Sequence, residues 1–318
     1  MTDFSWTKLP RGFTALSPMA GVTDSPFRRI CKKMGADVIF TEMISSEALL
    51  HNHDTTTKIM LYFEEWERPV VGQLMGSEAE RMAEAARRLE AMGFDGVDIN
   101  MGCPAKKIVG NACGSSLLDD PERAAAIVRA MVEAVEIPVS VKMRSGVSGR
   151  VQPEFALRMV EAGASALTIH PRTKEQAYRG QADWSITREI ARTCPVPVMG
   201  SGDLMSWGDV ERLFAETNCA GAFIARGSMG NPWIFKRAAY TPSIPEMIEV
   251  VREQCRLMLE LKGQHGLIEM RKHLGWYFKG FDGAAEVRNR ANSVVTMDDI
   301  EELFAIVRAR SGELRAAA

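Results

Sequence analysis

The alternation of short apolar segments with helical segments is the feature that most constrains the fold of this chain. Eight segments rich in branched apolar residues recur along the sequence, and a stretch of helical periodicity follows each. Repeated strand–helix units of this kind build a parallel sheet, and about eight of them close into a barrel. The predicted strands lie near residues 14–18, 37–42, 69–75, 95–100, 138–143, 165–170, 196–200 and 220–225. The sequence therefore predicts an α/β fold, a (β/α)8 TIM barrel.

The last quarter of the chain has a different pattern. After Pro242 and Pro245 the strand signal disappears, and residues 246–318 show helical periodicity only. The 318 residues also exceed the roughly 250 of a single barrel. We therefore expect two domains, a catalytic barrel over 1–241 and an all-helical domain over 242–318.

Composition indicates a soluble globular enzyme. Hydrophobic residues make up 46% and charged residues 25% of the chain, with a net charge of -2. The chain starts without a basic and apolar leader, and no apolar run approaches the roughly 18 residues of a membrane span. The six cysteines lack the two-residue spacing of zinc sites or redox pairs. These features predict a cytoplasmic protein with free thiols, no bound metal and no membrane contact.

Polar residues follow five of the predicted strands, at the end of a barrel where active sites form. One such residue is usually a satisfied core group, but five polar strand ends on one rim favour a binding site. Lys142 follows Val139-Ser140-Val141, where a buried cation needs an anionic or electron-rich partner. The residues at these ends are Ser17, Pro18, Met19, Ala20, Gln73, Asn100, Cys103, Lys142, Arg144, His170 and Arg172.

The last two predicted strands end in small residues. These are Gly200-Ser201-Gly202-Asp203 and Ala225-Arg226-Gly227, whose backbone amides could bind a phosphate, with Arg226 adding positive charge. Either loop alone could equally be a tight turn. Met205 stands where a Rossmann fingerprint would have its third glycine, so that motif is absent. A phosphate site, a central lysine and a rim glutamine together favour flavin mononucleotide (FMN).

Cys103 lies in the run from Asp98 to Lys107, just after the fourth predicted strand. Gly102 and Pro104 end the strand pattern there, so the thiol should lie in a loop. A lone cysteine is more often a small buried hydrophobe than a reactive group. Both interpretations stay open on this segment alone.

The sequence resembles the tRNA-dihydrouridine synthases, and among them the bacterial B-type most. The similarity covers nearly the whole chain. It rests on Pro18-Met19-Ala20-Gly21-Val22-Thr23-Asp24, on the Asp98–Lys107 run, on Gly230-Asn231-Pro232-Trp233-Ile234-Phe235, and on Arg271-Lys272-His273 with Trp276-Tyr277.

The resemblance implies an activity: reduction of a tRNA uridine, expected in the D-loop, to 5,6-dihydrouridine. Hydride would pass from reduced FMN to C6 and a proton from Cys103 to C5, with NADPH or NADH as reductant. A thiol is mostly protonated at neutral pH and suits this role. Asn100 and Arg144 would hold the uracil. The implied FMN contacts are Pro18, Met19, Ala20, Gln73, Lys142, His170, Ser201, Gly202, Asp203, Ala225 and Arg226.

Charge supports RNA binding only locally, because a net charge of -2 is not the signature of a nucleic-acid protein. Between residues 271 and 290, five basic residues outnumber two acidic ones, Asp282 and Glu286. A second basic cluster, Arg28, Arg29, Lys32 and Lys33, is expected to be a solvated helix face. We expect tRNA as partner, no DNA and no obligate protein partner. The predicted tRNA contacts are Arg271, Lys272, Lys279, Arg288 and Arg290.

Two other functions remain open from the sequence. One is a small-molecule flavin reductase of the dihydroorotate or dihydropyrimidine type, against which the helical C-terminal part argues. The other is a flavin-containing tRNA-binding protein without significant turnover. Replacing Cys103 by alanine tests the first hypothesis against these. If dihydrouridine formation survives undiminished while RNA binding persists, the proton-donor assignment is wrong.

Overall fold

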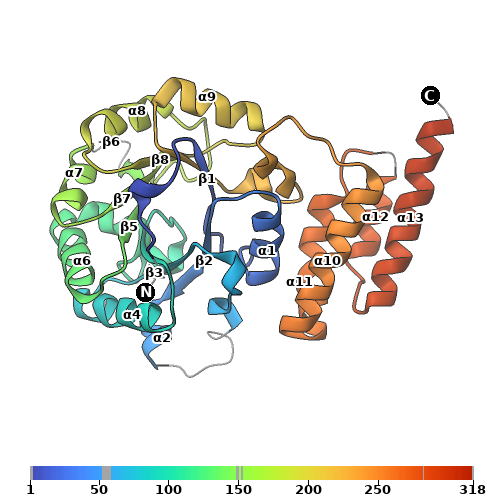
Figure 1. Cartoon of the computed structure of the whole chain (residues 1–318), viewed down its shortest axis with the longest axis horizontal. Coiled ribbons are helices and arrows are strands. Elements are labelled where there is room, and N and C mark those ends of the chain that lie inside the picture. Colours follow the sequence, from blue (N-terminus) through green and yellow to red (C-terminus); the bar gives the residue numbers. More distant parts are fainter. Residues whose placement is uncertain (1–2, 52–58, 148–149, 152, 282, 317–318) are drawn as a thin grey trace.

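Eight parallel strands form a closed barrel in the computed structural model, which describes residues 3–51, 59–147, 150–151, 153–281 and 283–316 (Figure 1). β1 pairs with both β2 and β9, and this pairing closes the sheet. The barrel strands are β1 (Phe13–Leu16), β2 (Val38–Ser45), β3 (Val70–Met75), β4 (Gly96–Met101), β5 (Val139–Val147), β7 (Ala166–Thr173), β8 (Val198–Ser201) and β9 (Gly221–Ile224). The predicted TIM barrel is confirmed. A short strand that the sequence did not predict, β6 (Arg150–Val151), pairs antiparallel with the end of β5.

Helices cover the outside of the barrel, and local sequence signals start several of them. Asp24 caps α1 by accepting from the N–H of Phe27, and Ser206 and Asp209 form a reciprocal capping box at α9. The barrel helices are α1 (Ser25–Lys33), α2 (Ser46–His51), α4 (Ala79–Ala91), α5 (Lys106–Val109), α6 (Pro121–Ala134), α7 (Pro153–Glu161), α8 (Trp184–Thr193) and α9 (Trp207–Thr217).

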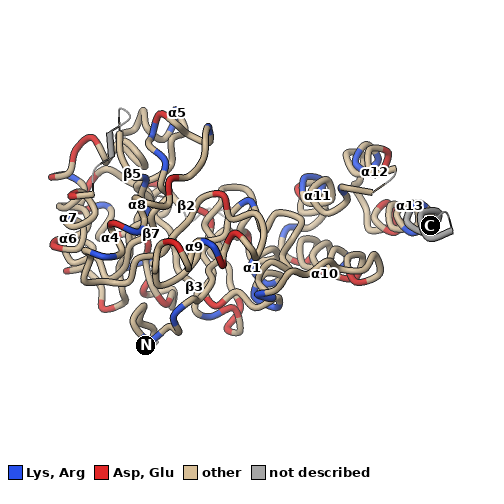
Figure 2. Tube along the Cα trace, turned by 90° about the horizontal axis from the view of Figure 1, so that it is seen from above, with Lys and Arg blue, Asp and Glu red and all other residues tan. Residues whose placement is uncertain are grey.

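The inside of the barrel is apolar at one end and polar at the other. Trp6, in a short 3-10 helix, packs against Phe13 and Phe40 and plugs the end where the strands begin. Inward positions nearer the strand ends hold polar side chains such as Gln73 and Asp98, both almost fully buried. Figure 2 shows the N-terminal segment and α5 at opposite ends of the barrel. The polar end with α5 is therefore the mouth, where a site can form.

Four helices follow the barrel, and α10 packs against α1 (Figure 1). They share a second hydrophobic core, to which Ile30 of α1 and Trp233 also belong. Lys262 Nζ lies 2.6 Å from Asp24 Oδ2 and ties this region to the start of α1. The helices are α10 (Ile244–Lys262), α11 (Gln264–Tyr277), α12 (Ala284–Ala291) and α13 (Met297–Ala316). The helical C-terminal region is thus confirmed, and the domain boundary at 241/242 stays a prediction.

The expected solvated face of α1 is wrong for Arg28. This side chain is fully buried, and its Nε lies 3.1 Å from Oε2 of Glu67, which is equally buried. Its Nη1 also donates to the carbonyl of Thr23 at 3.0 Å. The buried carboxylate requires a paired cation, which a count of charges along one helix does not reveal.

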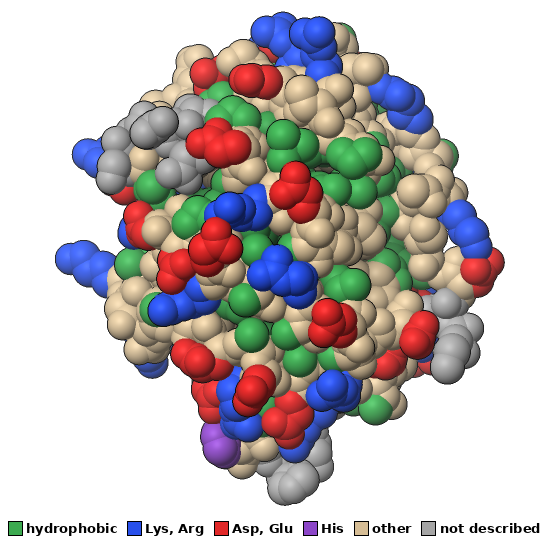
Figure 3. All heavy atoms as spheres, turned by 90° about the vertical axis from the view of Figure 1, so that its left-hand side faces the viewer, with side chains coloured by type: hydrophobic (Ala, Val, Ile, Leu, Met, Phe, Trp, Pro, Cys, Tyr) green, Lys and Arg blue, Asp and Glu red, His purple; other side chains and the backbone are tan. Residues whose placement is uncertain are grey.

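None of the described helices is both long and apolar enough to cross a membrane. The barrel face at the left of Figure 1 shows basic and acidic side chains interspersed, without one dominant sign (Figure 3).

Candidate active site

A cavity opens at the mouth of the barrel and gathers most of the predicted flavin residues. Residues after β1, from β5 and β7, and after β8 and β9 surround it. Its lining is Ser17, Pro18, Met19, Lys142, His170, Tyr178, Ser201, Gly202, Asp203, Leu204, Met205, Phe223, Ala225 and Arg226. Two predicted contacts do not line it: Ala20 is exposed beside it, and Gln73 is buried under the Cys103 loop.

The loops after β8 and β9 form a compact cradle on one side of this cavity. Gly202 has φ +96°, and a Cβ there would lie 2.9 Å from Cβ of Ala182. A Cβ on Gly227 would lie 2.0 Å from the carbonyl oxygen of Leu204, so the two loops touch. Only glycine permits so close an approach at these two positions.

Asp203 is held within the cradle by cations. Nη2 of Arg172 lies 2.7 Å from its carboxylate and Nη2 of Arg226 lies 3.3 Å away. Burial raises the pKa of Asp203, but the N–H of Ala182 and the guanidinium of Arg172 outweigh burial and lower it. The carboxylate is thus neutralised within the cradle, and nearly half of the Arg226 side chain remains exposed to meet an anion.

Lys142 points into the cavity without a bound partner. Among the residues that the structure describes, none forms a hydrogen bond or an ion pair with its Nζ. Burial lowers the pKa of Lys142 to about 8, whereas the charge of Asp98 raises it. Burial likewise raises the pKa of Asp98 to about 7. The expectation that Lys142 needs a ligand therefore agrees with its surroundings.

His170 is a neutral hydrogen-bonding group in this cavity. Burial and the nearby cations, Lys142 first among them, lower its pKa to about 2. Nη1 of Arg172 lies 3.3 Å from its Nε2, and because a guanidinium can only donate, Nε2 accepts. The proton of the neutral ring is therefore on Nδ1, which can donate to a ligand.

Cys103 lies on the opposite side of the mouth from the cradle, in a tightly packed loop. Its N–H donates to Oδ1 of Asn100 at 2.9 Å, and its carbonyl accepts from the N–H of Ser115 at 3.0 Å. Gly114 has φ +62°, and a Cβ there would lie 2.7 Å from the Cys103 carbonyl oxygen. The thiol is partly exposed, unlike the fully buried Cys31 and Cys255, as a reacting group must be.

Asn100 and Arg144, the predicted uracil contacts, both hold this loop. Oδ1 of Asn100 accepts from the N–H of Gly102 at 3.2 Å as well as from that of Cys103. Arg144 donates from Nε to the Gly102 carbonyl at 2.8 Å and from Nη1 to the Ala177 carbonyl at 2.8 Å. The structure thus brings both residues to the Cys103 loop and engages much of their hydrogen-bonding capacity there.

Sequence reasoning stopped at the strand ends and missed residues deeper in the barrel. Asp98 and Ser140 point inward, two positions before Asn100 and Lys142, which the alternation along a strand could have indicated. Tyr178 also lies at the mouth, with Arg144 and Arg226 at 5.6 and 5.1 Å from its ring centre. It belongs to the loop after β7.

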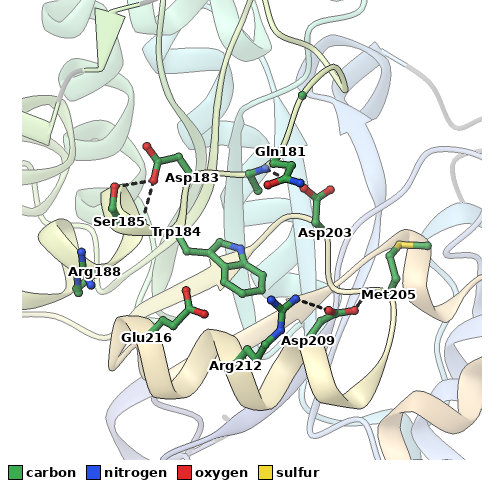
Figure 4. A pocket seen from close by; sticks show the side chains of 12 residues that line it. Gln181, Asp183, Trp184, Ser185, Arg188, Asp203, Met205, Asp209, Arg212 and Glu216 are labelled. Carbon is green, nitrogen blue, oxygen red and sulfur yellow. Dashed lines mark hydrogen bonds and ion pairs between the residues drawn. The ribbon is translucent and has the colours of Figure 1, made fainter.

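A second groove lies outside the barrel, between α8 and α9 (Figure 4). The guanidinium of Arg212 lies 5.4 Å from the ring centre of Trp184. Nε1 of Trp184 donates to the Gly202 carbonyl at 3.1 Å and supports the cradle from outside. Across the described ranges, no group of three or more His, Cys, Asp or Glu side chains is arranged as a metal site.

The predicted tRNA contacts on the helical region are in different environments. Lys279 and Arg288 are exposed, whereas Arg290 pairs with Glu302 at 2.7 Å. Arg271 donates to the Val294 carbonyl, and Nζ of Lys272 lies 3.6 Å from where a Cβ of Gly21 would be. In Figure 2, α11 and α12 lie on the same side of the molecule as α5. Of the five predicted basic residues, only Lys279 and Arg288 are thus exposed.

The family model for dihydrouridine synthase (Dus) matches residues 15–310, nearly the whole chain. The chain belongs to the dihydrouridine synthase family. A probable tRNA-dihydrouridine synthase of Rhizobium leguminosarum is 37% identical over 92% of this chain and 93% of its own. The tRNA-dihydrouridine synthase B of Pseudomonas aeruginosa is 34% identical over 89% of each chain. The match of this dihydrouridine synthase family member includes both the mouth and the helical region.

Solved structures show likeness in fold only. A 2-naphthoyl-CoA reductase complex has a TM-score of 0.55 at 12% identity, over 70% of this chain and 49% of that one. A histamine dehydrogenase from Rhizobium has a TM-score of 0.54 at 13% identity, over 77% and 48%. Both cover enough of this chain to support the barrel architecture.

Proposed function

We propose that this protein reduces a uridine of tRNA to 5,6-dihydrouridine, with FMN as its cofactor and NADPH or NADH as reductant. The observation that carries the proposal is the mouth cavity, in which the unpartnered Lys142 lies between the glycine cradle and the Cys103 loop. The dihydrouridine synthases that are similar over 92% and 89% of the chain support it.

The residues around the cavity suit the chemistry of both ends of FMN. The Ser201-Gly202-Asp203 loop with Ala225 and Arg226 would hold the phosphate. The flavin ring would lie against Pro18, Met19 and Ala20, with Lys142 and the Nδ1–H of His170 as donors to its polar edge and Gln73 below. When bound and reduced, FMN supplies the hydride that adds to C6 of the uracil.

The protein's own part in the reaction is to position the uracil and to supply a proton. Cys103 holds this proton on its thiol and gives it to C5. Asn100 and Arg144 fix the loop and would contact the uracil with the atoms that the loop does not engage. Because the cavity lies within the barrel mouth, the uridine must leave the stack of the folded RNA to reach it.

Exposed basic residues of the helical region would bind the tRNA backbone. Lys279 and Arg288 are the best candidates because both are exposed, whereas Arg271, Lys272 and Arg290 are half-buried. We propose the D-loop as the target, as the resemblance to the B-type implies. A cytoplasmic location and the absence of DNA or of an obligate protein partner stay predictions.

The test is an assay of the purified, FMN-loaded protein with unmodified tRNA transcripts and NADPH. We expect dihydrouridine at one D-loop position, and a loss of at least about 100-fold in rate for Cys103→Ala. Cys113→Ala is the matched control, because that thiol donates to the Asn111 carbonyl in the same loop. Turnover of free dihydropyrimidine precursors but not of tRNA would favour the small-molecule reductase. Tight tRNA binding without product would favour the binding protein.

A further inference from the structure

Asp98 is a fully buried carboxylate of β4 to which the steps above assign no task. Its Oδ1 accepts from Oγ of Ser140 at 2.7 Å, and its Oδ2 accepts from Nε2 of Gln73 at 2.7 Å. Removing a charge of this kind from water is costly, so both bonds are needed to keep it in the barrel.

The bond to Gln73 continues toward the mouth as a chain of side chains. Oε1 of Gln73 accepts from Nδ2 of Asn100 at 2.9 Å. Oδ1 of Asn100 then accepts from the backbone N–H groups of Gly102 and Cys103. Three consecutive hydrogen-bonding steps thus connect Asp98 to the loop that carries Cys103.

The direction of this chain is fixed at its loop end. The two backbone N–H groups can only donate, so Oδ1 of Asn100 faces them and its Nδ2 faces Gln73. The amide of Gln73 then also has one orientation, with Nε2 toward Oδ2 of Asp98. We propose that Asp98 is a positioning residue, whose acceptor oxygen orients the amides of Gln73 and Asn100 and thereby holds the Cys103 loop in place. Its importance for turnover rests on the proposed function, in which Cys103 gives the proton.

Ser140 is the one member of the chain that can reverse its part, because a hydroxyl both donates and accepts. In Asp98→Asn the new amide can turn, so that its oxygen still faces Gln73 and its NH2 group donates to Ser140. In Ser140→Ala the carboxylate still accepts from Gln73. Each single variant therefore preserves the orientation of both amides.

The double variant Asp98→Asn/Ser140→Ala does not preserve it. The NH2 group of the asparagine at position 98 has no acceptor on the alanine side and must turn toward Gln73. The amide of Gln73 then reverses its orientation, and the amide of Asn100 reverses in turn. The NH2 group of Asn100 then faces the N–H groups of Gly102 and Cys103, and the loop is released. The two donor groups face each other at the loop rather than at position 98, because the loop is partly exposed to water and position 98 is not.

The test is the alkylation rate of Cys103 by iodoacetamide in the full-length, FMN-loaded protein, measured by peptide mass spectrometry. We expect each single variant within about twofold of the unmodified protein, and the double variant at least about fivefold faster than the product of the single effects. Asp98→Asn/Ser140→Thr restores an acceptor and should return to the rate of the unmodified protein.

Two results would overturn the proposal: a double variant that equals the product of the singles, or an Asp98→Asn variant that is already as fast as the double. If the alanine double variant does not fold, Asp98→Asn and the threonine double variant decide, since both must match the unmodified protein.

Alkylation does not depend on what Cys103 does in turnover. In the tRNA assay only the double variant should then lose at least about tenfold in the rate of flavin reoxidation, and Cys103→Ala tests that function separately.

Discussion

At the scale of single residues, Lys142 is the residue whose expected need for a ligand agrees best with its surroundings in the site. The structure leaves its ammonium group without a protein partner among the described residues, in the cavity where FMN would bind. A half-buried cation in this position is stabilised by an anionic or electron-rich ligand in the cavity.

For Lys142→Met we expect the FMN dissociation constant to rise at least about tenfold, or about 1.4 kcal/mol. The free energy of unfolding of the FMN-free protein should change by no more than about 1 kcal/mol, because loss of the desolvation cost opposes loss of attraction to Asp98. Fluorescence titration with FMN and urea unfolding measure the two quantities. Lys174→Met, which breaks the rim ion pair with Asp119, is the control, and an equal loss of FMN affinity there would refute the prediction.

Gly202 allows a second prediction at this scale. Gly202→Ala adds a Cβ at φ +96° and 2.9 Å from Ala182, so we expect a loss of about 2 kcal/mol in unfolding free energy and weaker FMN binding. Gly180→Ala is the matched control, since that glycine also has positive φ, +65°, but apart from its chain neighbours no described residue lies within 4 Å of its added Cβ. Urea unfolding and FMN titration compare them. Equal effects of both variants would show that the contact with Ala182 is unimportant.

At the scale of elements, the seam between α1 and α11 depends on a neutral histidine. His273 lies 5.2 Å from the ring of Phe27 and 4.8 Å from that of Trp276, and its Nδ1 accepts from Gln254. Burial, with smaller effects of Lys272 and Lys262, lowers the pKa of His273 to about 3, while Glu269 raises it slightly. Protonation of this side chain therefore opposes the packing of the helical region on the barrel.

The sign of the pH effect follows from the difference in the pKa of His273 between the folded and the unfolded state. Above pH 6.5 neither state binds the proton, and the stability is complete; as the pH falls from 6.5 toward 3, only the unfolded state binds it, and stability is lost. We expect His273→Gln to remove roughly 2 kcal/mol of the loss between pH 6.5 and 4.5. Urea unfolding at several pH values measures this. Parallel pH curves for the variant and the unmodified protein would contradict it.

At the scale of the whole molecule, a net charge of -2 is compatible with RNA binding only if basic groups gather on one side. α11 and α12 lie on the side of the mouth, whereas the barrel face in Figure 3 shows mixed charges. The location of exposed cations therefore matters more than their total number.

For the variant Lys279→Ala/Arg288→Ala we expect tRNA affinity to fall about tenfold or more. The slope of log affinity against log salt should fall by roughly 1 to 2, because two phosphate contacts are lost. Filter binding at several salt concentrations measures both. Arg123→Ala/Arg158→Ala removes the same charge from α6 and α7, and its affinity should stay near that of the unmodified protein. Equal losses would indicate an effect of net charge alone.

The sequence by itself determined the barrel, the helical region and the mouth residues. Strand periodicity and loop composition are local, and the C-terminal ends of parallel strands must meet, so Lys142, His170 and Cys103 could be assigned to one rim. Only the tertiary structure decided which polar groups pair inside. The Arg28–Glu67 ion pair joins residues 39 positions apart, and the chain from Asp98 crosses from β4 to β3 and back. Such contacts depend on how strands and helices pack in space. The spacing of residues along the chain does not indicate which distant residues come together.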